Sequence, residues 1–376
     1  MTHTEQRERA RALLDQRGIG RALFAHPGSV TWLTGFAAAP QLGPSLFSGG
    51  PALVWYADGD WTLIVLDSYA EPAQASGLPV VTYLGYTIAQ PVAGPALLAT
   101  ALRGVAGASR PHGPVGVEVA HLPMALGVAL QEALSAPAEV TAIDGWLLPL
   151  QTVKTAEELD KLRPNFALTD IGHAAARAAV WPGQREIDVW TAIEEAIQRA
   201  AGQRVPVGND CVVGYRQNNV GGWPGDLEIH AHDSLIVDLS TLLHGYWSDS
   251  CATYYAGEPT ARQRELHAVV TAALQFAISR IRPGAIASDV DRAVRGFITD
   301  AGYPVYPHHT GHSVGISGHG DPRIVPYNDA VLEPGMVLML EPGIYYPGET
   351  GVRLEDAVLV TSSGAEVLTH HDKSLP

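Results

Sequence analysis

The segment WPGQREIDVWTAIEEAIQRAAG, residues 181–202, recurs in outline further along the chain as RPGAIASDVDRAVRGFITDAG, residues 282–302. Each copy is typical of a Pro-Gly turn followed by a helix that ends at Ala-Gly. Such a turn is common, so this match alone could arise by chance. Because a β-rich segment with two carboxylates follows each copy, we interpret the pair as halves of a pseudo-twofold repeat with a site at its midline.

The first β-rich segment is SLIVDLSTLLHGYWSDSCATYYAG, residues 234–257. Its alternating apolar residues predict an antiparallel hairpin. If Thr241 pairs with Tyr246, Asp238 lies directly opposite Asp249, with the two Cβ atoms about 5 Å apart. Two like charges at this spacing are destabilising unless a cation lies between them, so the hairpin favours a divalent metal ion.

The second β-rich segment is VLMLEPGIYYPGETGVRLEDAVLVT, residues 337–361. A turn centred on Gly348 places Glu341 opposite Glu355, which repeats the geometry of the first hairpin. One such pair could be solvated charge at a sheet edge, but two facing pairs in matched halves of a repeat favour a metal site. Arg353 shares the strand face of Glu355 and is placed to orient a carboxylate ligand.

Four histidines lie between the two hairpins, in the run HHTGHSVGISGHGDP, residues 308–322. Neutral imidazole is the commonest nitrogen ligand of metal ions, and the glycines of this run allow close backbone approach. Some of these histidines could be loop residues only. One nitrogen and four carboxylates suit Mn, Co or Zn, and two ions would balance the charge. Paired ions generate hydroxide at neutral pH and stabilise a tetrahedral intermediate, so the pattern predicts a two-metal hydrolase.

Composition limits the remaining classes of function. The chain carries 24 Lys plus Arg against 39 Asp plus Glu, for a formal net charge of -15, so we expect no nucleic-acid partner. Its two cysteines, Cys211 and Cys251, favour a reducing compartment over a disulfide framework. The charged N-terminus lacks a signal-peptide core, and no apolar run is long enough to span a membrane. We therefore expect a cytoplasmic location.

The length of 376 residues predicts two domains. Strand and helix patterns alternate to about Ile143, with a hairpin signal at Asp58-Gly59, which predicts a compact α/β domain over residues 1–150. Residues 145–152 read as a linker. Residues 151–376 then form an α+β domain that contains the repeat.

Several motifs together resemble the pita-bread metallopeptidases, and within them the Xaa-Pro branch of aminopeptidase P and prolidase. The motifs are the two aspartates of the first hairpin, His-x-x-x-His-x-x-Gly-x-x-x-His at 308–319, Glu-Pro-Gly at 341–343 and Val-Arg-Leu-Glu-Asp at 352–356. Residues 11–36 resemble the creatinase-like N-terminal domain of that branch, and residues 154–163 resemble the beginning of its catalytic domain. The resemblance covers nearly the whole chain.

This resemblance implies a creatinase-like α/β domain followed by a pita-bread α+β catalytic domain with an internal pseudo-twofold repeat. It implies a peptidase that cleaves short peptides, at Xaa-Pro bonds, by attack of a hydroxide that bridges two divalent ions. The ligands that it implies for Mn, Co or Zn are Asp238, Asp249, His312, Glu341 and Glu355. A homodimer is a further family-level expectation.

The resemblance also implies individual roles. Asp249 and Glu355 would bridge the two ions, and Glu341 would act as acid and base beside the attacking water. His308 and His319 match histidines that contact the substrate or the tetrahedral intermediate, although a structural role for His308 stays open. His309 has no counterpart in the family pattern, so we interpret it as a loop residue.

Two departures from the family pattern concern the substrate. Position 221 is Gly where the family places a substrate-contacting His, while Pro224 keeps its register. Cys251 shares the strand face of Asp249, which leaves open a thiol near the metals, but the favoured interpretation is a buried apolar filler. These changes leave the expected ligands intact and weaken the case for proline specificity.

Three functions therefore stay open. The first is a Xaa-Pro peptidase, and the second is a metallopeptidase of the same fold that cleaves non-proline dipeptides or a C-terminal residue. The third is a binding protein that has lost the chemistry. The complete ligand set argues against this third function and against metal-free creatinase-like chemistry, because uncompensated carboxylates around a pocket are costly.

Overall fold

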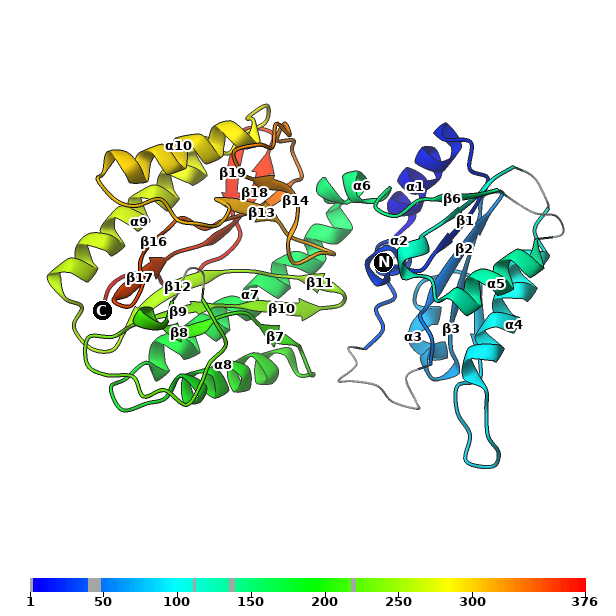
Figure 1. Cartoon of the computed structure of the whole chain (residues 1–376), viewed down its shortest axis with the longest axis horizontal. Helices are drawn as coiled ribbons and strands as arrows, with labels where there is room; N and C mark the ends of the chain where they lie inside the picture. Colours follow the sequence, from blue (N-terminus) through cyan, green and yellow to red (C-terminus); the bar gives the residue numbers. More distant parts are fainter. Residues whose placement is uncertain (1–2, 40–48, 111–112, 135–138, 218–220) are drawn as a thin grey trace. The chain divides into compact units, whose positions relative to one another are not determined.

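Contacts along the chain divide it into two units, residues 1–151 and 152–376. The computed structural model describes residues 3–39, 49–110, 113–134, 139–217 and 221–376. Figure 1 shows a helix-covered sheet in the first unit and strands enclosed by long helices in the second. Within these described ranges, no helix is both long and apolar enough to cross a membrane.

A mixed sheet of six strands, in the order β4-β3-β2-β1-β5-β6, forms the centre of the first unit. Its strands are β1 (Arg21–Phe24), β2 (Leu53–Ala57), β3 (Asp60–Leu66), β4 (Val80–Tyr83), β5 (Val115–Val117) and β6 (Val140–Ala142). The accompanying helices are α1 (Thr4–Gln16), α2 (Pro27–Thr34), η1 (Asp67–Tyr69), α3 (Ala70–Gln74), α4 (Gly94–Gly107), η2 (Val119–His121), α5 (Met124–Ala133) and α6 (Leu148–Thr152). The alternation confirms the predicted α/β character, and α6 lies inside the segment that was expected to be a linker.

The predicted hairpin at Asp58-Gly59 is confirmed. Strands β2 and β3 pair with Ala57 opposite Asp60, so Asp58 and Gly59 form a two-residue loop. Both loop residues have positive φ, 54° and 99°. This conformation matches the right-handed twist of the flanking strands, which is why Asp-Gly is a strong hairpin signal.

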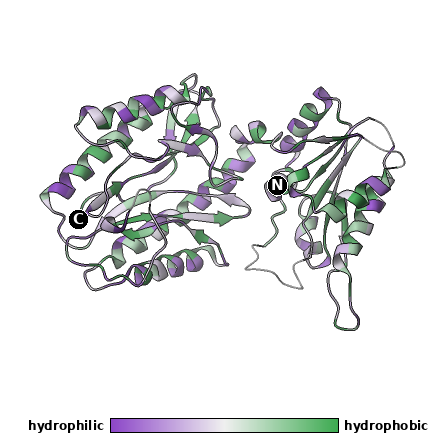
Figure 2. Ribbon diagram, in the orientation of Figure 1, coloured by the Kyte–Doolittle hydropathy of each residue, from purple (hydrophilic) through white to green (hydrophobic). Residues whose placement is uncertain are grey.

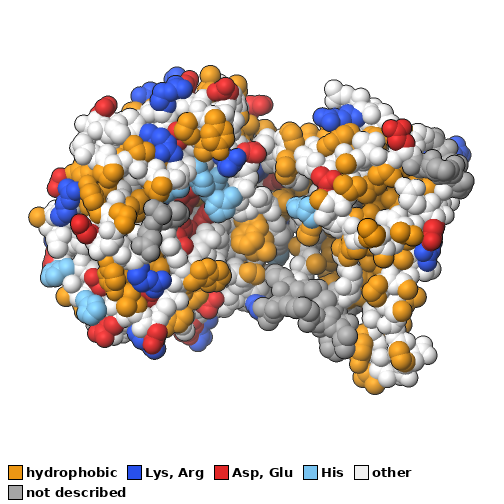
Figure 3. Space-filling view, in the orientation of Figure 1, with side chains coloured by type: hydrophobic (Ala, Val, Ile, Leu, Met, Phe, Trp, Pro, Cys, Tyr) orange, Lys and Arg blue, Asp and Glu red, His pale blue; other side chains and the backbone are white. Residues whose placement is uncertain are grey.

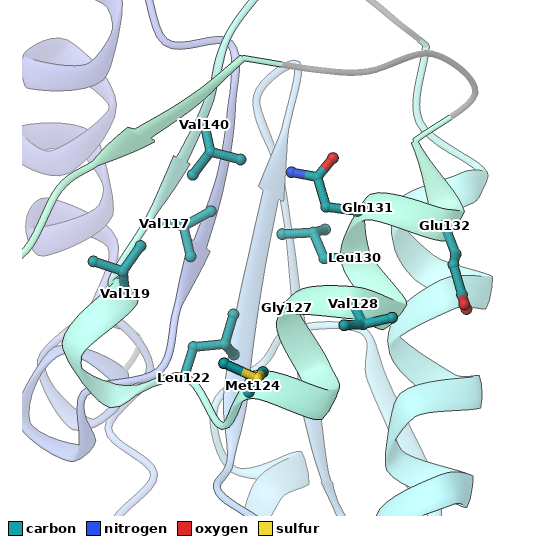
Figure 4. Close-up of a pocket in the computed structure, with 10 residues that line it drawn as sticks. All are labelled: Val117, Val119, Leu122, Met124, Gly127, Val128, Leu130, Gln131, Glu132 and Val140. Atoms are coloured by element: carbon teal, nitrogen blue, oxygen red, sulfur yellow. The ribbon is translucent and has the colours of Figure 1, made fainter.

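An apolar groove of about 800 Å³ lies between α5 and the edge of this sheet (Figure 4). Val117 of β5 and Val140 of β6 line one wall, and Leu122, Met124 and Val128 are among the residues that line the rest. The Met124 side chain is 86% exposed, so part of this lining faces solvent. The groove carries none of the acidic or imidazole residues that the sequence predicts for the site.

Two helix pairs enclose the strands of the second unit (Figure 1). The helices are α7 (Ala156–Ala179), α8 (Glu186–Ala201), α9 (Ala261–Arg280) and α10 (Ala287–Asp300), with the short η3 (Gly214–Arg216) between strands. In α10, Val290, Val294 and Ile298 recur every four residues, and all three are buried. Figure 2 shows this alternation of hydrophobic and hydrophilic residues along the helices of the unit.

The internal repeat predicted from the sequence is present in the backbone. Gly183 and Gly284 both have positive φ, 90° and 80°, in the turns that precede α8 and α10. The residue before each of these helices forms an isolated antiparallel bridge, Arg185 with Glu228 in the first half and Ile286 with Val331 in the second. Each helix is therefore fixed in the same way to a later segment of its own half.

The strands of the second unit follow each helix pair. The first half contains β7 (Val207–Gly208), β8 (Cys211–Val213), β9 (Ser234–Asp238), β10 (Ser240–Leu243), β11 (Tyr246–Trp247) and β12 (Cys251–Tyr255). The second half contains β13 (Gly311–Ser313), β14 (Gly320–Ile324), β15 (Val337–Leu340), β16 (Gly343–Tyr346), β17 (Thr350–Arg353), β18 (Asp356–Thr361) and β19 (Gly364–Val367). In each half the hairpin strands are interrupted, and the predicted carboxylates lie at or next to the interruptions.

The register predicted for the first hairpin is wrong by two residues. Leu243 pairs with Tyr246 and Leu242 with Trp247, so Asp238 lies opposite Cys251 and not opposite Asp249. The cause is a two-residue loop at His244-Gly245, where both residues have positive φ, 51° and 78°. A shift of two residues preserves the side-chain face, so Asp238 and Asp249 still share a face and are diagonal neighbours.

The register predicted for the second hairpin is confirmed. Strands β16 and β17 pair from Tyr346–Thr350 to Gly343–Arg353, and β15 and β18 continue with Leu340 opposite Asp356. Glu341 and Glu355 face each other in the gap between these two ladders. Their amide groups bond outside the hairpin, Glu341 N–H to the Thr310 carbonyl at 2.9 Å and Glu355 N–H to the Cys251 carbonyl at 2.9 Å.

Candidate metal centre

The structure brings all the predicted ligands together at the midline of the repeat. His312 is on β13, and the four carboxylates come from the interrupted strands of both hairpins. All of these side chains are buried, namely Asp238, Asp249, His312, Glu341 and Glu355. Figure 3 shows acidic and histidine side chains gathered in a hollow on the face of the second unit.

His312 lies at the centre of this group. Its Nε2 is 3.7 Å from Asp249 Oδ2 and 3.7 Å from Glu341 Oε1. Its Nδ1 lies 3.0 Å from the Ser313 carbonyl, which fixes the proton on Nδ1 and leaves Nε2 free to ligate. Burial lowers the pKa of His312 to about 4, so the ring is neutral at pH 7. One ligand atom each from Asp249, His312 and Glu355 lie within 4.8 Å of one another.

Gly311 sets the position of His312. Strand β13 approaches β15 so closely that a Cβ atom on Gly311 would lie 1.9 Å from the Met339 carbonyl oxygen. Only glycine allows this separation without moving one of the strands. This close approach of β13 to β15 places the imidazole of His312 beside Glu341, which directly follows β15.

The electrostatics of the carboxylates favour a bound cation. Burial, together with the charge of Asp238, raises the pKa of Asp249 well above its usual range. Burial and the charges of Asp249 and Glu341 do the same to the pKa of Glu355. Glu355 Oε2 is buried and has no hydrogen-bond partner among the described residues. An unpaired buried carboxylate oxygen is costly, and a divalent ion would satisfy it, so this donor set fits a metal.

Arg353 takes the orienting position predicted for it. The side chain is almost fully buried, and its Nη2 donates to Asp238 Oδ2 at 2.8 Å. The same nitrogen donates to Asp210 Oδ2 at 2.6 Å, and Nη1 donates to the Tyr345 hydroxyl at 3.2 Å. One guanidinium therefore positions two aspartates of the first half from a strand of the second half.

Sequence reasoning missed Asn209 and Asp210. The amide of Asn209 lies 3.1 Å from Asp238 Oδ1, 2.6 Å from Ser240 Oγ and 3.3 Å from Asp249 Oδ1. Asp210 exchanges both backbone hydrogen bonds with Asp238, at 3.0 and 2.9 Å, which places its side chain beside that ligand. The short pairing before β8 carries no periodic pattern, so neither residue could be predicted from the sequence.

The histidines of the 308–319 run differ in their contacts. The side chain of His308 is 6% exposed; its Nε2 lies 2.8 Å from the Tyr345 hydroxyl, and its Nδ1 is 3.7 Å from Glu341 Oε2. His319 is exposed and stacks on His312, with ring centroids 4.1 Å apart. His309 lies outside any helix or strand, as expected for a loop residue, but its Nε2 lies 2.7 Å from Glu341 Oε1, a contact that the sequence did not predict. These histidine contacts lower the pKa of Glu341 despite its burial.

The two sequence departures have structural explanations. Gly221 has φ 147°, and a Cβ atom there would lie 1.7 Å from Asp210 Oδ2, so Asp210 fills the space beside this glycine. Cys251 is fully buried, and its Sγ lies 3.7 Å from the Arg353 carbonyl. Burial raises the pKa of this thiol. This supports the interpretation of Cys251 as a packed, protonated side chain.

Two family models cover most of the chain. The model described as "Metallopeptidase family M24" matches residues 160–362, and the "Creatinase/Prolidase N-terminal domain" matches residues 6–163. An Xaa-Pro dipeptidase of Pyrococcus furiosus is 34% identical over 238 residues, which are 63% of this chain and 68% of that protein. An uncharacterised peptidase of Staphylococcus aureus is 33% identical over 232 residues, and this match spans only 66% of its length.

Solved structures match over the whole chain. An Xaa-Pro dipeptidase from Bacillus anthracis has a TM-score of 0.82 at 27% identity and covers 100% of this chain and 99% of its own. The prolidase from Pyrococcus horikoshii has a TM-score of 0.81 at 25% identity and covers 99% and 100%. These matches confirm the creatinase-like N-terminal domain and the pita-bread catalytic domain expected from the sequence.

Proposed function

This chain belongs to metallopeptidase family M24, and we propose that it hydrolyses short peptides at Xaa-Pro bonds with two divalent ions. The observation that carries this proposal is the set of four buried carboxylates that converge with His312, one of them with an unsatisfied oxygen. Such a set is costly to maintain without cations and is suited to Mn, Co or Zn.

Some residues of the centre are proposed to bind the ions, and others position these ligands. Asp249, Glu355 and His312, which offer ligand atoms within 4.8 Å of one another, would hold the ions together with Asp238 and Glu341. When bound, the ion pair supplies a hydroxide at neutral pH and stabilises the charge of the tetrahedral intermediate. Arg353 and Asn209 hold Asp238 in place through the hydrogen bonds given above.

Glu341 is the proposed acid and base. His309 contacts its Oε1 at 2.7 Å and His308 lies 3.7 Å from its Oε2, so both carboxylate oxygens have fixed positions. Glu341 would accept the proton of the attacking water and return it to the leaving amine. His308 and His319, which flank the group on its buried and exposed sides, are proposed to contact the substrate.

Activity against a panel of dipeptides and tripeptides, with added Mn, Co or Zn, tests the reaction. We expect metal-dependent cleavage with the highest kcat/KM on Xaa-Pro substrates. Elemental analysis after loading and desalting should approach two equivalents of metal per chain. A folded protein that retains no metal, and whose thermal stability does not change on chelation, would contradict the proposed centre and favour a binding protein.

A second substrate class is favoured by the surroundings of Gly221. The resemblance places a substrate-contacting imidazole at this position, and here the Asp210 carboxylate occupies the adjacent space. A carboxylate and an imidazole differ in charge and in hydrogen-bond donors. Cleavage of non-proline dipeptides or of a C-terminal residue is therefore the alternative. A higher kcat/KM on the proline-free members of the same panel would select it.

The homodimer and the cytoplasmic location stay predictions. The first would be tested by sedimentation of the full chain, and the second by fractionation of cells that express it at native level.

A further inference from the structure

Three histidines form a second group of possible ligands at the mouth of the centre. One ring nitrogen each from His309, His312 and His319 lie within 4.8 Å of one another. The rings are close, with centroids 5.1 Å apart for His309 and His312, and 5.8 Å for His309 and His319. Three imidazoles at this spacing suit Zn, Ni or Co, which accept nitrogen ligands readily.

This imidazole group differs from the carboxylate group in accessibility. His319 is exposed and His309 is half-buried, whereas His312, Asp249 and Glu355 are all buried. An ion that arrives from solvent therefore meets imidazoles before it meets the carboxylates.

His312 is common to the two groups. Since its Nδ1 faces the Ser313 carbonyl, only Nε2 is available, and one nitrogen lone pair binds one ion at a time. Glu341 Oε1 lies between the groups, 2.7 Å from His309 Nε2 and 3.7 Å from His312 Nε2. The outer and inner positions are thus adjacent and are alternative uses of the same imidazole.

We propose that His309, His312 and His319 form an outer capture site for a borderline divalent cation, from which His312 transfers the ion inward to Asp249 and Glu355. In capture, the hydrated ion exchanges water molecules for three ring nitrogens. In transfer, the bonds to His309 and His319 break as carboxylate oxygens bind, and the bond to His312 is kept. The inference rests on the proposed function only in taking the carboxylates as the final ligands.

The test separates the two positions by mutation. The double variant Asp249→Asn/Glu355→Gln neutralises the two carboxylates to which the ion would be transferred and keeps their side-chain shapes, so we expect it to fold. Equilibrium dialysis with Zn or Ni should show about one retained equivalent, and X-ray absorption should show imidazole ligation. Adding His309→Gln should weaken this binding by at least about 10- to 100-fold. Mn, which prefers oxygen ligands, should not be retained by the double variant.

A matched control uses a histidine outside the group. His230 has a largely exposed side chain beside Asp233, and His230→Gln in the same double variant should leave the retained equivalent unchanged. Loss of the ion in this control would mean adventitious surface binding and would overturn the proposal. A folded double variant that retains no Zn or Ni, or one whose binding is indifferent to His309→Gln, would overturn it as well.

Transfer has its own readout. With the inner carboxylates intact, His309→Gln should slow the uptake of Zn or Co by the apoprotein, measured by stopped-flow with a chromophoric chelator, and leave the final stoichiometry unchanged. An unchanged uptake rate would overturn the capture role. Peptide cleavage by the wild type loaded with Mn is measured separately, so an active wild type without an outer site would refute only this inference, and an inactive wild type with one would refute the proposed function.

Discussion

The aspartate pair and the glutamate pair of the candidate centre differ in what holds their carboxylates. Asp238 accepts hydrogen bonds from Arg353 and Asn209, and the same Asn209 amide lies within 3.3 Å of Asp249. Glu355 Oε2 has no partner among the residues that the structure describes, and the ion-pair partners of Glu341 among the same residues are the imidazoles of His308, His309 and His312. Hydrogen-bond donors of the chain therefore position the two aspartate carboxylates. The two glutamate carboxylates are available to bind a cation and to accept a proton.

The largest expected effect is on the glutamate side. Glu341→Gln keeps the shape of the side chain and removes its ability to accept a proton, so turnover should fall by about 10²- to 10⁴-fold. Thermal unfolding should change little by comparison. Glu366→Gln, at an exposed ion pair with Arg163, is the control for loss of a carboxylate. Wild-type turnover in Glu341→Gln would show that the acid and base has been wrongly assigned.

On the aspartate side the effect should be on stability. Arg353→Met leaves Asp238 and Asp210 without their shared donor, and breaking a buried ion pair costs about 3–5 kcal/mol of unfolding free energy. Arg163→Met breaks an exposed pair and should cost less than about 1 kcal/mol. Urea denaturation of both apoproteins measures the difference. Equal costs for the two variants would mean that Arg353 does not position the aspartates.

A third prediction concerns the space shared by Gly221 and Asp210. Gly221→His alone should destabilise the protein, because its Cβ would collide with the Asp210 carboxylate. The double variant Gly221→His/Asp210→Ala removes that collision and offers the imidazole to a substrate. A hydrogen bond to a charged group is worth about 1.5–3 kcal/mol, so preference for Xaa-Pro over proline-free peptides should rise about 10- to 150-fold.

The ratio of kcat/KM on the two substrate classes is the measurement for this double variant, with Asp210→Ala as its control. A folded, metal-loaded double variant with the ratio of the control would refute a role for position 221 in substrate choice.

We expect the smallest effect from loss of the Asn209 side-chain amide, which contacts both Asp238 and Asp249. Asn209→Ala removes its contacts with Asp238 and Asp249, and loss of such a supporting residue weakens metal binding by about 10- to 100-fold. Competition with a chelator measures the affinity. Asn328→Ala, which loses a hydrogen bond to the Arg323 carbonyl, should leave it unchanged. Equal affinities in the two variants would remove Asn209 from the centre.

The sequence predicted most of the fold because its signals were local. The turn at Gly348 correctly placed Glu341 opposite Glu355, since the loop there follows the expected pairing. The first hairpin was predicted two residues out of register, because His244-Gly245 forms a tighter loop than the alternation of apolar residues suggested. The face on which Asp238 and Asp249 lie was still predicted correctly. Side chains alternate between the two faces of a strand, so a register shift of two residues leaves each side chain on its predicted face.

The parts of the centre that the sequence did not predict depend on contacts between distant segments. Asn209 and Asp210 reach the centre through the pairing of residue 210 with Asp238, which no turn or periodic pattern announces. His309 was interpreted as a loop residue because the family pattern has no counterpart for it, yet the backbone turns its ring toward Glu341. The roles of such residues depend on how the backbone folds around the centre, which a family pattern does not contain.

The contact at Gly311 has a consequence for attempts to alter this protein by selection. Since any side chain there would displace β13 from β15, a library that randomises position 311 should return glycine alone among functional clones. The neighbouring ligand position, His312, would be lost together with that strand separation. Engineering of metal preference should therefore vary the ligand residues themselves and keep glycine at position 311. The spacing of β13 and β15 at this glycine determines whether His312 can reach the same ion as the carboxylates.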